Sequence, residues 1–277
     1  RLSGPVIESS GGIAQGMSGS PVYVDGKLIG AISGGFDMSD HFLALITPAD
    51  QMLKLLDLLE PTNEAPVTTV GSRAPDENEA QLSGRQNPPS GQPLFVPLAL
   101  QGLTARSARL LERNLVNYLG WRPARMVPMG AAESIGRSGE KSAGSGSPGS
   151  APDRGAGDSK AGISPGSAIA LQLAWGDVQI AAGGTLSYLD DRGRFLALGH
   201  PFLNKGAVAY PIALASVHET VKSLQMPFRI LSVGEPIGVV EQDRMAGVAG
   251  RLGRILDGIP IEIRVSDRET GRVSQFR

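Results

Sequence analysis

The chain has 277 residues, 41% of them hydrophobic, and a formal net charge of −1 at pH 7. This length accommodates about two domains, and the balanced charge gives no sign of a nucleic-acid partner. There is no cysteine, which excludes disulfides and a thiol nucleophile. The apolar runs are far shorter than the ~20 residues that a membrane-spanning helix needs. The 37 glycines and short runs of Val, Ile and Leu favour a turn-rich β protein.

The first segment, residues 1–59, is predicted to contain short strands followed by one helix. The strands are expected at Pro5–Ile7, Ser20–Val24, Leu28–Ile32 and Phe42–Ile46. Asp25 and Gly26 lie between the second and third of these and predict a tight hairpin turn. A helix is expected from Ala49 to about Leu59, because its apolar residues recur at helical spacing.

Two segments in the middle of the chain have the composition of linkers. Residues 60–92 are rich in Pro, Asn, Ser, Glu and Gly, and residues 130–165 are a low-complexity run of Gly, Ser and Ala. The second run buries too little apolar surface to order itself, so disorder is predicted there. The connector between them, residues 93–129, is predicted to hold a strand at Leu94–Leu100 and a helix from about Thr104, its N-cap, to Leu119.

Residues 166–277 are again predicted to be β-rich. Strands are expected at Ala168–Leu173, Val178–Ala182, Gly184–Leu189, Phe195–Leu198, Ile230–Val233, Ile237–Glu241 and Ile261–Val265. The turn from Asp190 to Gly193 is predicted to join two of them as a hairpin. A helix is expected next to His218.

The candidate nucleophile is Ser18, in Gly16-Met17-Ser18-Gly19-Ser20-Pro21. This pattern is typical of a serine in a tight glycine turn, where the amides of Gly16 and Ser18 can point at one spot beside the hydroxyl. That spot is where a tetrahedral intermediate carries its negative oxygen. One alternative is a tight loop in a non-catalytic barrel. Another is an esterase, although the Gly-x-Ser-x-Gly elbow lacks its last glycine because Ser20 stands there.

The candidate general base is His200, which follows a predicted strand and lies between Gly199 and Pro201. A general base for a serine needs a neutral imidazole within hydrogen-bond reach. The alternative is a histidine that caps the strand. His41, in a predicted exposed loop, and His218 are less favoured. No phosphate-loop motif and no metal-ligand spacing occur, so neither a cofactor nor a metal is expected.

Gly11–Pro21, with Asp25–Ala31 behind it, resembles the nucleophile block of the SpoIVB peptidases. These are serine peptidases of the chymotrypsin-like clan, named for a bacterial sporulation signalling protease. Gly184–Ser187 and Ala197–His200 resemble their histidine block. The resemblance implies two chymotrypsin-like β-barrels that meet at a cleft, with Ser18 in residues 1–59 and His200 in residues 166–277. It also implies an exported or cell-envelope serine endopeptidase that acts on proteins, peptides or itself.

The chain departs from the sporulation protease in two respects. Ser18 precedes His200 here, whereas the histidine block comes first in that protease; triads are defined by geometry, so a permuted pair of barrels can still build one site. No PDZ-like segment is found. Residues 1–59 hold too few strands for a six-stranded barrel, so further strands of the same polypeptide are expected upstream of Arg1.

The candidate third member of a triad is Asp243, at the end of a predicted strand. In a chymotrypsin-like first barrel, the acid also follows the histidine by some tens of residues. Asp243 could instead pair with Arg244 or cap a turn, and Asp190 and Asp191 rank below it as hairpin residues. The sporulation protease is thought to place an acid where this chain has Ser3, so a Ser–His dyad stays open.

The sequence leaves two classes of function open. The first is a serine endopeptidase that works through an acyl-enzyme and has a self-processing or regulatory role. The second is a catalytically inactive protease-like scaffold that binds peptides or cell-envelope components. Reaction of Ser18 with a fluorophosphonate distinguishes them.

Overall fold

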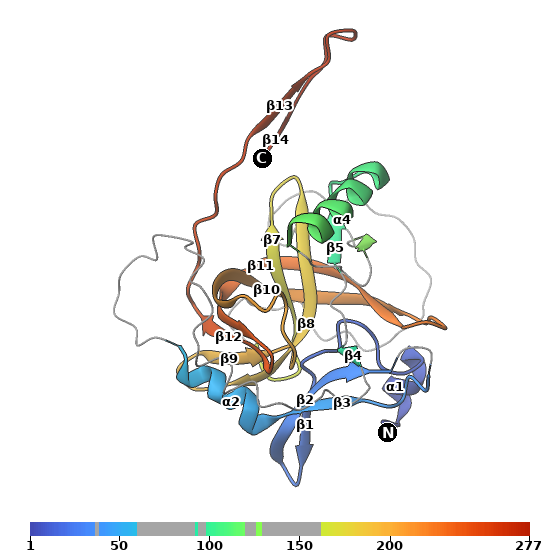
Figure 1. The fold of residues 1–277 in the computed structure, drawn as a ribbon, viewed down its shortest axis with the longest axis vertical. Helices are drawn as coiled ribbons and strands as arrows, with labels where there is room; N and C mark the ends of the chain where they lie inside the picture. The colour runs from blue at the N-terminus through green and yellow to red at the C-terminus, as the bar shows by residue number, and fades with distance from the viewer. Residues whose placement is uncertain (37–38, 60–91, 94–97, 120–125, 129–161) are drawn as a thin grey trace, which may run out of the picture.

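The computed structural model describes residues 1–36, 39–59, 92–93, 98–119, 126–128 and 162–277 (Figure 1). The fold is mainly β with a few short helices, as the sequence predicts. The predicted linkers at 60–92 and 130–165 lie almost entirely outside the described residues. Within the described ranges, no helix combines the length and the apolar character needed to cross a membrane.

The C-terminal half of the described chain closes into a ring of strands. The ring follows the order β8 (Gln179–Leu189), β7 (Ala168–Ala174), β10 (Gly206–Val221), β11 (Phe228–Arg244), β12 (Gly247–Leu252) and β9 (Arg194–Ala197). Antiparallel pairing of β8 with β9 completes it. Its interior is filled by apolar side chains that include Leu171, Leu186, Phe195 and Ile212, each fully buried. His200 follows β9, one of the strands of this ring.

A smaller sheet carries the segment around Ser18. Its strands are β1 (Pro21–Val24), β2 (Lys27–Gly35), β3 (Leu45–Pro48) and β4 (Gln92–Pro93), and β2 pairs with the other three. Asp25 and Gly26 have φ values of 50° and 73°, the backbone of a type I′ turn. The predicted Asp-Gly hairpin is therefore confirmed.

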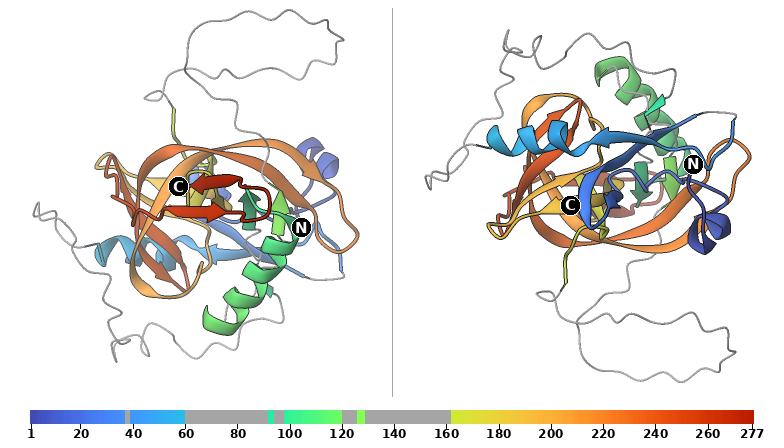
Figure 2. Two further views of the ribbon diagram at one scale, coloured as in Figure 1. Left: turned by 90° about the horizontal axis from the view of Figure 1, so that it is seen from above. Right: turned by 90° about the horizontal axis from the view of Figure 1, so that it is seen from below.

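Helix α2 (Ala49–Asp57) joins the small sheet to the barrel. Met52, Leu55 and Leu56 pack between Ala31 of β2 and the barrel residue Leu196, among others, and are 2%, 5% and 6% exposed. Burying such side chains stabilises the docking by about 2 kcal/mol each. Figure 2 shows α2 lying along the barrel beside β9 and β12. The helix predicted from apolar spacing is thus confirmed, and that spacing is what binds the two sheets together.

The remaining elements extend the barrel. β5 (Leu98–Gln101) pairs with β8, and β6 (Met126–Pro128) runs parallel to β5. Helix α4 (Ala105–Leu119) begins after Thr104, whose Oγ1 accepts the Ser107 amide at 3.2 Å, as expected of an N-cap. At the C-terminus, β13 (Ile263–Ser266) and β14 (Val273–Phe276) form a hairpin that projects from the barrel (Figure 1).

Several predicted boundaries are wrong for identifiable reasons. The strand predicted at Pro5–Ile7 is a helix, α1 (Pro5–Ser10), because proline suits the first turn and Gly11 ends the helix with a φ of 76°. The helix expected beside His218 is part of strand β10. The two strands predicted around Pro236 are one strand, β11, which accommodates this proline through irregular pairing with β10.

Gly19 lies very close to the backbone of the barrel. Its φ is +92°, and a Cβ there would lie 2.0 Å from the Thr185 carbonyl oxygen and 2.5 Å from the Leu198 amide nitrogen. Both neighbours are backbone atoms of the barrel, which cannot move aside as a flexible side chain could. Glycine is therefore required at this position.

Gly19→Ala should lower the free energy of unfolding by more than about 3 kcal/mol, because it combines a left-handed backbone with a backbone clash. Gly26→Ala is the matched control: its φ is +73°, but nothing lies within 4 Å of the added Cβ. The control should cost only about 1–2 kcal/mol. Urea denaturation measures both. Equal losses in the two variants would contradict the close approach at Gly19.

Candidate active site

The loop that carries Ser18 is fastened to the barrel through its main chain. The Gln15 amide donates to the Pro227 carbonyl at 2.8 Å, and the Gln15 carbonyl accepts from the Arg229 amide at 3.1 Å. Three residues on, the Ser18 carbonyl accepts from the Thr185 amide at 2.8 Å. Figure 2 shows the β10–β11 ribbon reaching past the barrel to this N-terminal segment. Strands β11 and β8 together therefore fix the path of the nucleophile loop.

The predicted oxyanion amides are those of Gly16 and Ser18. The peptide bonds of the described residues are all trans, so the Gly16 N–H points away from the Gln15 carbonyl, which faces β11. Within the described ranges, neither the Gly16 amide nor the Ser18 amide donates to another protein group. Free amide donors are what an oxyanion hole requires, and the role of these two amides stays a prediction.

His200 follows β9 through a strained turn. Leu198 and Gly199 have φ values of 67° and 70°, and the left-handed region is unusual for leucine. The turn is held because Thr47 Oγ1 of β3 donates to the Gly199 carbonyl at 2.5 Å. A Cβ at Gly199 would lie 3.3 Å from the Ile32 carbonyl oxygen, and that oxygen accepts the Gly19 amide at 2.7 Å. The serine and histidine loops thus meet at the same point of β2.

The imidazole of His200 is held in one tautomer. Its Nδ1 lies 2.8 Å from the Pro201 carbonyl oxygen, which can only accept, so Nδ1 carries the proton and Nε2 keeps a lone pair. Burial lowers the pKa of His200 from 6.5 to about 4, and the Pro201 carbonyl opposes this only in part. The ring is therefore neutral at pH 7, with Nε2 ready to accept a proton.

Ser18 Oγ and His200 Nε2 are both buried, and neither has a hydrogen-bond partner. The bond between them is therefore not formed in this arrangement. An unsatisfied buried polar group costs about 1–3 kcal/mol, and one hydroxyl-to-imidazole bond would satisfy both. Catalytic hydrogen bonds commonly tighten only when substrate is present. Ser18 is 0% exposed, so a substrate carbonyl reaches Oγ only after the covering residues shift.

Asp243 is fully buried, but its carboxylate does not contact the His200 ring through a hydrogen bond. Its two oxygens accept the Phe202 amide at 2.8 Å and the Leu203 amide at 2.7 Å. Burial raises the pKa of Asp243, while amide donors that include those of Phe202 and Leu203 act in the opposite direction. The Pro201 carbonyl, and not an acid, accepts the hydrogen bond from His200 Nδ1. Asp243 anchors the loop after His200, and a direct catalytic role for it stays a prediction.

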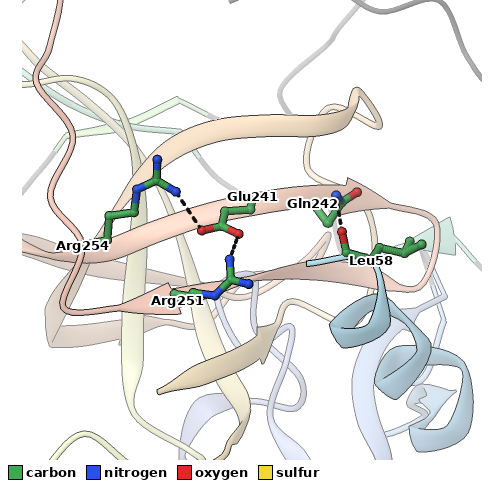
Figure 3. A network of polar contacts seen from close by, with 5 residues as sticks. All are labelled: Leu58, Glu241, Gln242, Arg251 and Arg254. Atoms are coloured by element: carbon green, nitrogen blue, oxygen red, sulfur yellow. Dashed lines mark hydrogen bonds and ion pairs between the residues drawn. The ribbon is translucent and has the colours of Figure 1, made fainter. Parts of the chain in front are cut away.

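Three consecutive residues of β11 contact three different parts of the molecule, and Figure 3 shows the first two, Glu241 and Gln242. Glu241 accepts hydrogen bonds from Arg251 and from Arg254, the latter at 3.2 Å, and so ties β12 and the segment after it to β11. Gln242 Nε2 donates to the Leu58 carbonyl at 3.2 Å and secures the end of α2. Asp243 then holds the His200 loop, so this stretch of β11 organises the site from behind.

The other titratable candidates lie in structural settings. His218 Nε2 is 3.0 Å from Ser232 Oγ across β10 and β11, on the exposed side of the ribbon. Asp190 pairs with Arg194 at 2.7 Å within its hairpin turn. His41 Nε2 is buried without a partner, and so forms no hydrogen bond with Ser18.

Sequence reasoning missed three side chains that hold the nucleophile loop. Thr185 Oγ1 and Arg229 Nη1 both donate to the Gly16 carbonyl, at 3.2 and 3.1 Å, and Ser187 Oγ donates to the Gly19 carbonyl at 2.7 Å. Thr185 and Ser187 occupy alternate positions of a buried strand, an available signal that one polar face meets something polar. Nothing in the sequence around Arg229 indicates its contact.

Comparison with known proteins identifies a family match in the N-terminal part of the chain. Residues 3–41 match the model of the SpoIVB peptidase S55 family. The match confirms the resemblance predicted from the sequence and includes Ser18 and Gly16, whereas His200 and Asp243 lie outside it. No curated protein and no solved structure matches the chain.

Asp243→Asn should lower the free energy of unfolding by about 2 kcal/mol, because the amide group would set an N–H donor against one of the two backbone amides. Asp191→Asn, in an exposed hairpin turn, is the matched control and should change stability by less than about 0.5 kcal/mol. Urea titrations followed by circular dichroism give both values. If Asp243→Asn left the free energy of unfolding unchanged, these two hydrogen bonds would not stabilise the fold.

Proposed function

We propose that this SpoIVB-type serine peptidase is an endopeptidase in which Ser18 is the nucleophile and His200 the general base. One observation carries the proposal: Ser18 Oγ and His200 Nε2 are complementary, buried and unpartnered, on two loops that meet at β2. A buried hydroxyl and a buried imidazole without partners are costly to keep. A reaction that uses both accounts for their retention.

The proposed chemistry is acyl transfer. His200 Nε2 takes the Ser18 proton as Oγ bonds to the peptide carbonyl carbon, and the amides of Gly16 and Ser18 face the resulting oxyanion. The imidazolium then gives its proton to the leaving amine as the peptide C–N bond breaks. Water, deprotonated in turn by His200, releases the acyl group and restores Ser18. Throughout, the Pro201 carbonyl keeps Nδ1 protonated and the ring in place.

We propose a restricted substrate range, either a site in the chain itself or a regulatory protein target. The complete burial of Ser18 supports this, because unrestricted degradation needs an open site. An exported or cell-envelope location is proposed on the family resemblance alone. The competing proposal is an inactive scaffold that binds peptides or envelope components. It is favoured by the missing Ser18–His200 bond and by a carbonyl, rather than a carboxylate, on His200 Nδ1.

The folded chain should form a covalent adduct at Ser18 with diisopropyl fluorophosphate, a probe small enough for a confined site, and with a larger fluorophosphonate. Ser18→Ala should abolish labelling, and should reduce any peptide cleavage by ~10⁴-fold or more. Ser20→Ala, two residues away, is the control that keeps the nucleophile. Mass spectrometry of the intact protein and its peptides locates the adduct. A folded chain that never labels with either probe favours the scaffold.

The rate of Ser18 labelling should depend on pH through His200. Because burial lowers the pKa of His200 to about 4, the base is protonated and inactive only below that pH. Labelling should therefore stay nearly constant from pH 7 to pH 5 and fall by half near pH 4. Circular dichroism at each pH confirms that the protein remains folded. A midpoint near 6.5, the ordinary histidine value, would show that His200 is not buried when it acts.

A further inference from the structure

We propose that Arg229 is a positioning residue. By donating a hydrogen bond to the carbonyl oxygen of Gly16, it holds the loop that carries Ser18 so that the Gly16 amide stays free to bind the oxyanion. The inference rests on the proposed function, since it concerns the same amides. Arg229 lies at the start of β11, more than two hundred positions after the loop it contacts. It therefore links the barrel directly to the stretch beside the nucleophile.

Arg229 donates hydrogen bonds to two successive carbonyl groups of the loop that carries Ser18. Its backbone amide donates to the Gln15 carbonyl at 3.1 Å, and its Nη1 donates to the Gly16 carbonyl at 3.1 Å. The aliphatic part of the Arg229 side chain packs on Gly16, since a Cβ added there would lie 3.4 Å from Arg229 Cδ and 3.5 Å from Arg229 Cβ. The main chain and the side chain of one residue thus fix two adjacent peptide groups.

The position of this arginine is not explained by an ion pair. In the described part of the chain, no carboxylate pairs with Arg229, and its Nε is buried without a hydrogen-bond partner. Burial lowers its pKa, which reflects the cost of removing the charge from water. Arg251, elsewhere in the same sheet, has the usual arrangement with Glu241. Burying a guanidinium without an ion-pair partner costs free energy, so stability alone does not account for its bond to Gly16.

The role of this bond follows from peptide geometry. If the peptide between Gln15 and Gly16 rotated by half a turn, a carbonyl oxygen would replace the Gly16 N–H, and the oxyanion would meet an acceptor instead of a donor. The Arg229 backbone amide opposes that rotation because it donates to the Gln15 carbonyl at 3.1 Å. Arg229 Nη1 and Thr185 Oγ1 hold the following peptide through the Gly16 carbonyl, at 3.1 and 3.2 Å. Because glycine rotates freely about both of its backbone bonds, the Gly16 N–H keeps its direction only when the peptides on both sides are held. Loss of a single oxyanion donor costs ~10²–10³ in rate. Because Thr185 remains, loss of Arg229 alone should cost ~10–100-fold.

The test measures how fast a fluorophosphonate modifies Ser18 as the probe concentration is raised to saturation. Arg229→Met keeps the length of the side chain but removes the donor, and should lower the limiting rate constant ~10–100-fold. The half-saturating probe concentration should stay unchanged, because the loop acts on the reacting oxygen and not on probe binding. Arg229→Lys should recover part of the rate. Arg251→Met, the matched control from the same sheet, should alter stability but not the rate per folded molecule.

Thr185→Val should also lower the limiting rate, and it keeps the proposal testable if Arg229→Met fails to fold. Because both residues act on one oxygen, the combined Arg229→Lys and Thr185→Val effect should differ from the product of the single effects. The proposal is overturned if wild type reacts and the folded Arg229 and Thr185 variants react equally fast. A folded wild type that never reacts overturns the proposed function itself and this role with it, so the two failures are distinct.

Discussion

At Ser18 and Gly19, the main chain of the nucleophile loop lies directly against main-chain atoms of the barrel. At Gly19 this leaves no room for even a methyl group, and the backbone bond from Thr185 to Ser18 continues the contact. Backbone hydrogen bonds have far fewer ways to rearrange than side-chain contacts, so the path of the loop is set once the barrel exists. The turn before His200 docks at the same junction. Both halves of the candidate site therefore depend on one close approach.

The orientation of His200 shows how a carbonyl group can replace an acid. The Pro201 oxygen selects the tautomer that leaves Nε2 free, which is the geometric task of the carboxylate in a triad. A neutral carbonyl stabilises the imidazolium less than a carboxylate does, so burial dominates and the pKa of His200 falls to about 4. The buried carboxylate nearby is Asp243, whose oxygens are bonded to backbone amides. The His200 imidazole is therefore a weaker base than one paired with a carboxylate, but it stays neutral over a wider pH range.

The parts of this molecule that the sequence predicted are those with local causes. The Asp25-Gly26 turn, the helix α2 and the glycine turn at Ser18 each follow from residues a few positions apart. The contact of Arg229 with Gly16 could not be predicted, because it joins segments far apart in the chain and no sequence pattern indicates it. The role of Pro201 was hidden for another reason: a carbonyl oxygen is present at every residue and has no sequence signature. Asp243 was identified, but its partners depended on the loop path.

Strand β11 runs unbroken from Phe228 to Arg244, and its two ends serve different loops. Arg229, near its start, holds the Gly16 carbonyl, while Asp243, near its finish, holds the turn after His200. This strand pairs with β10 and β12, so neither end is in place until the ring of strands has formed. A partly folded chain thus carries a serine and a histidine without the geometry that would make them reactive. Under the proposed function, completion of the barrel would itself guard against premature cleavage while the protein is being made.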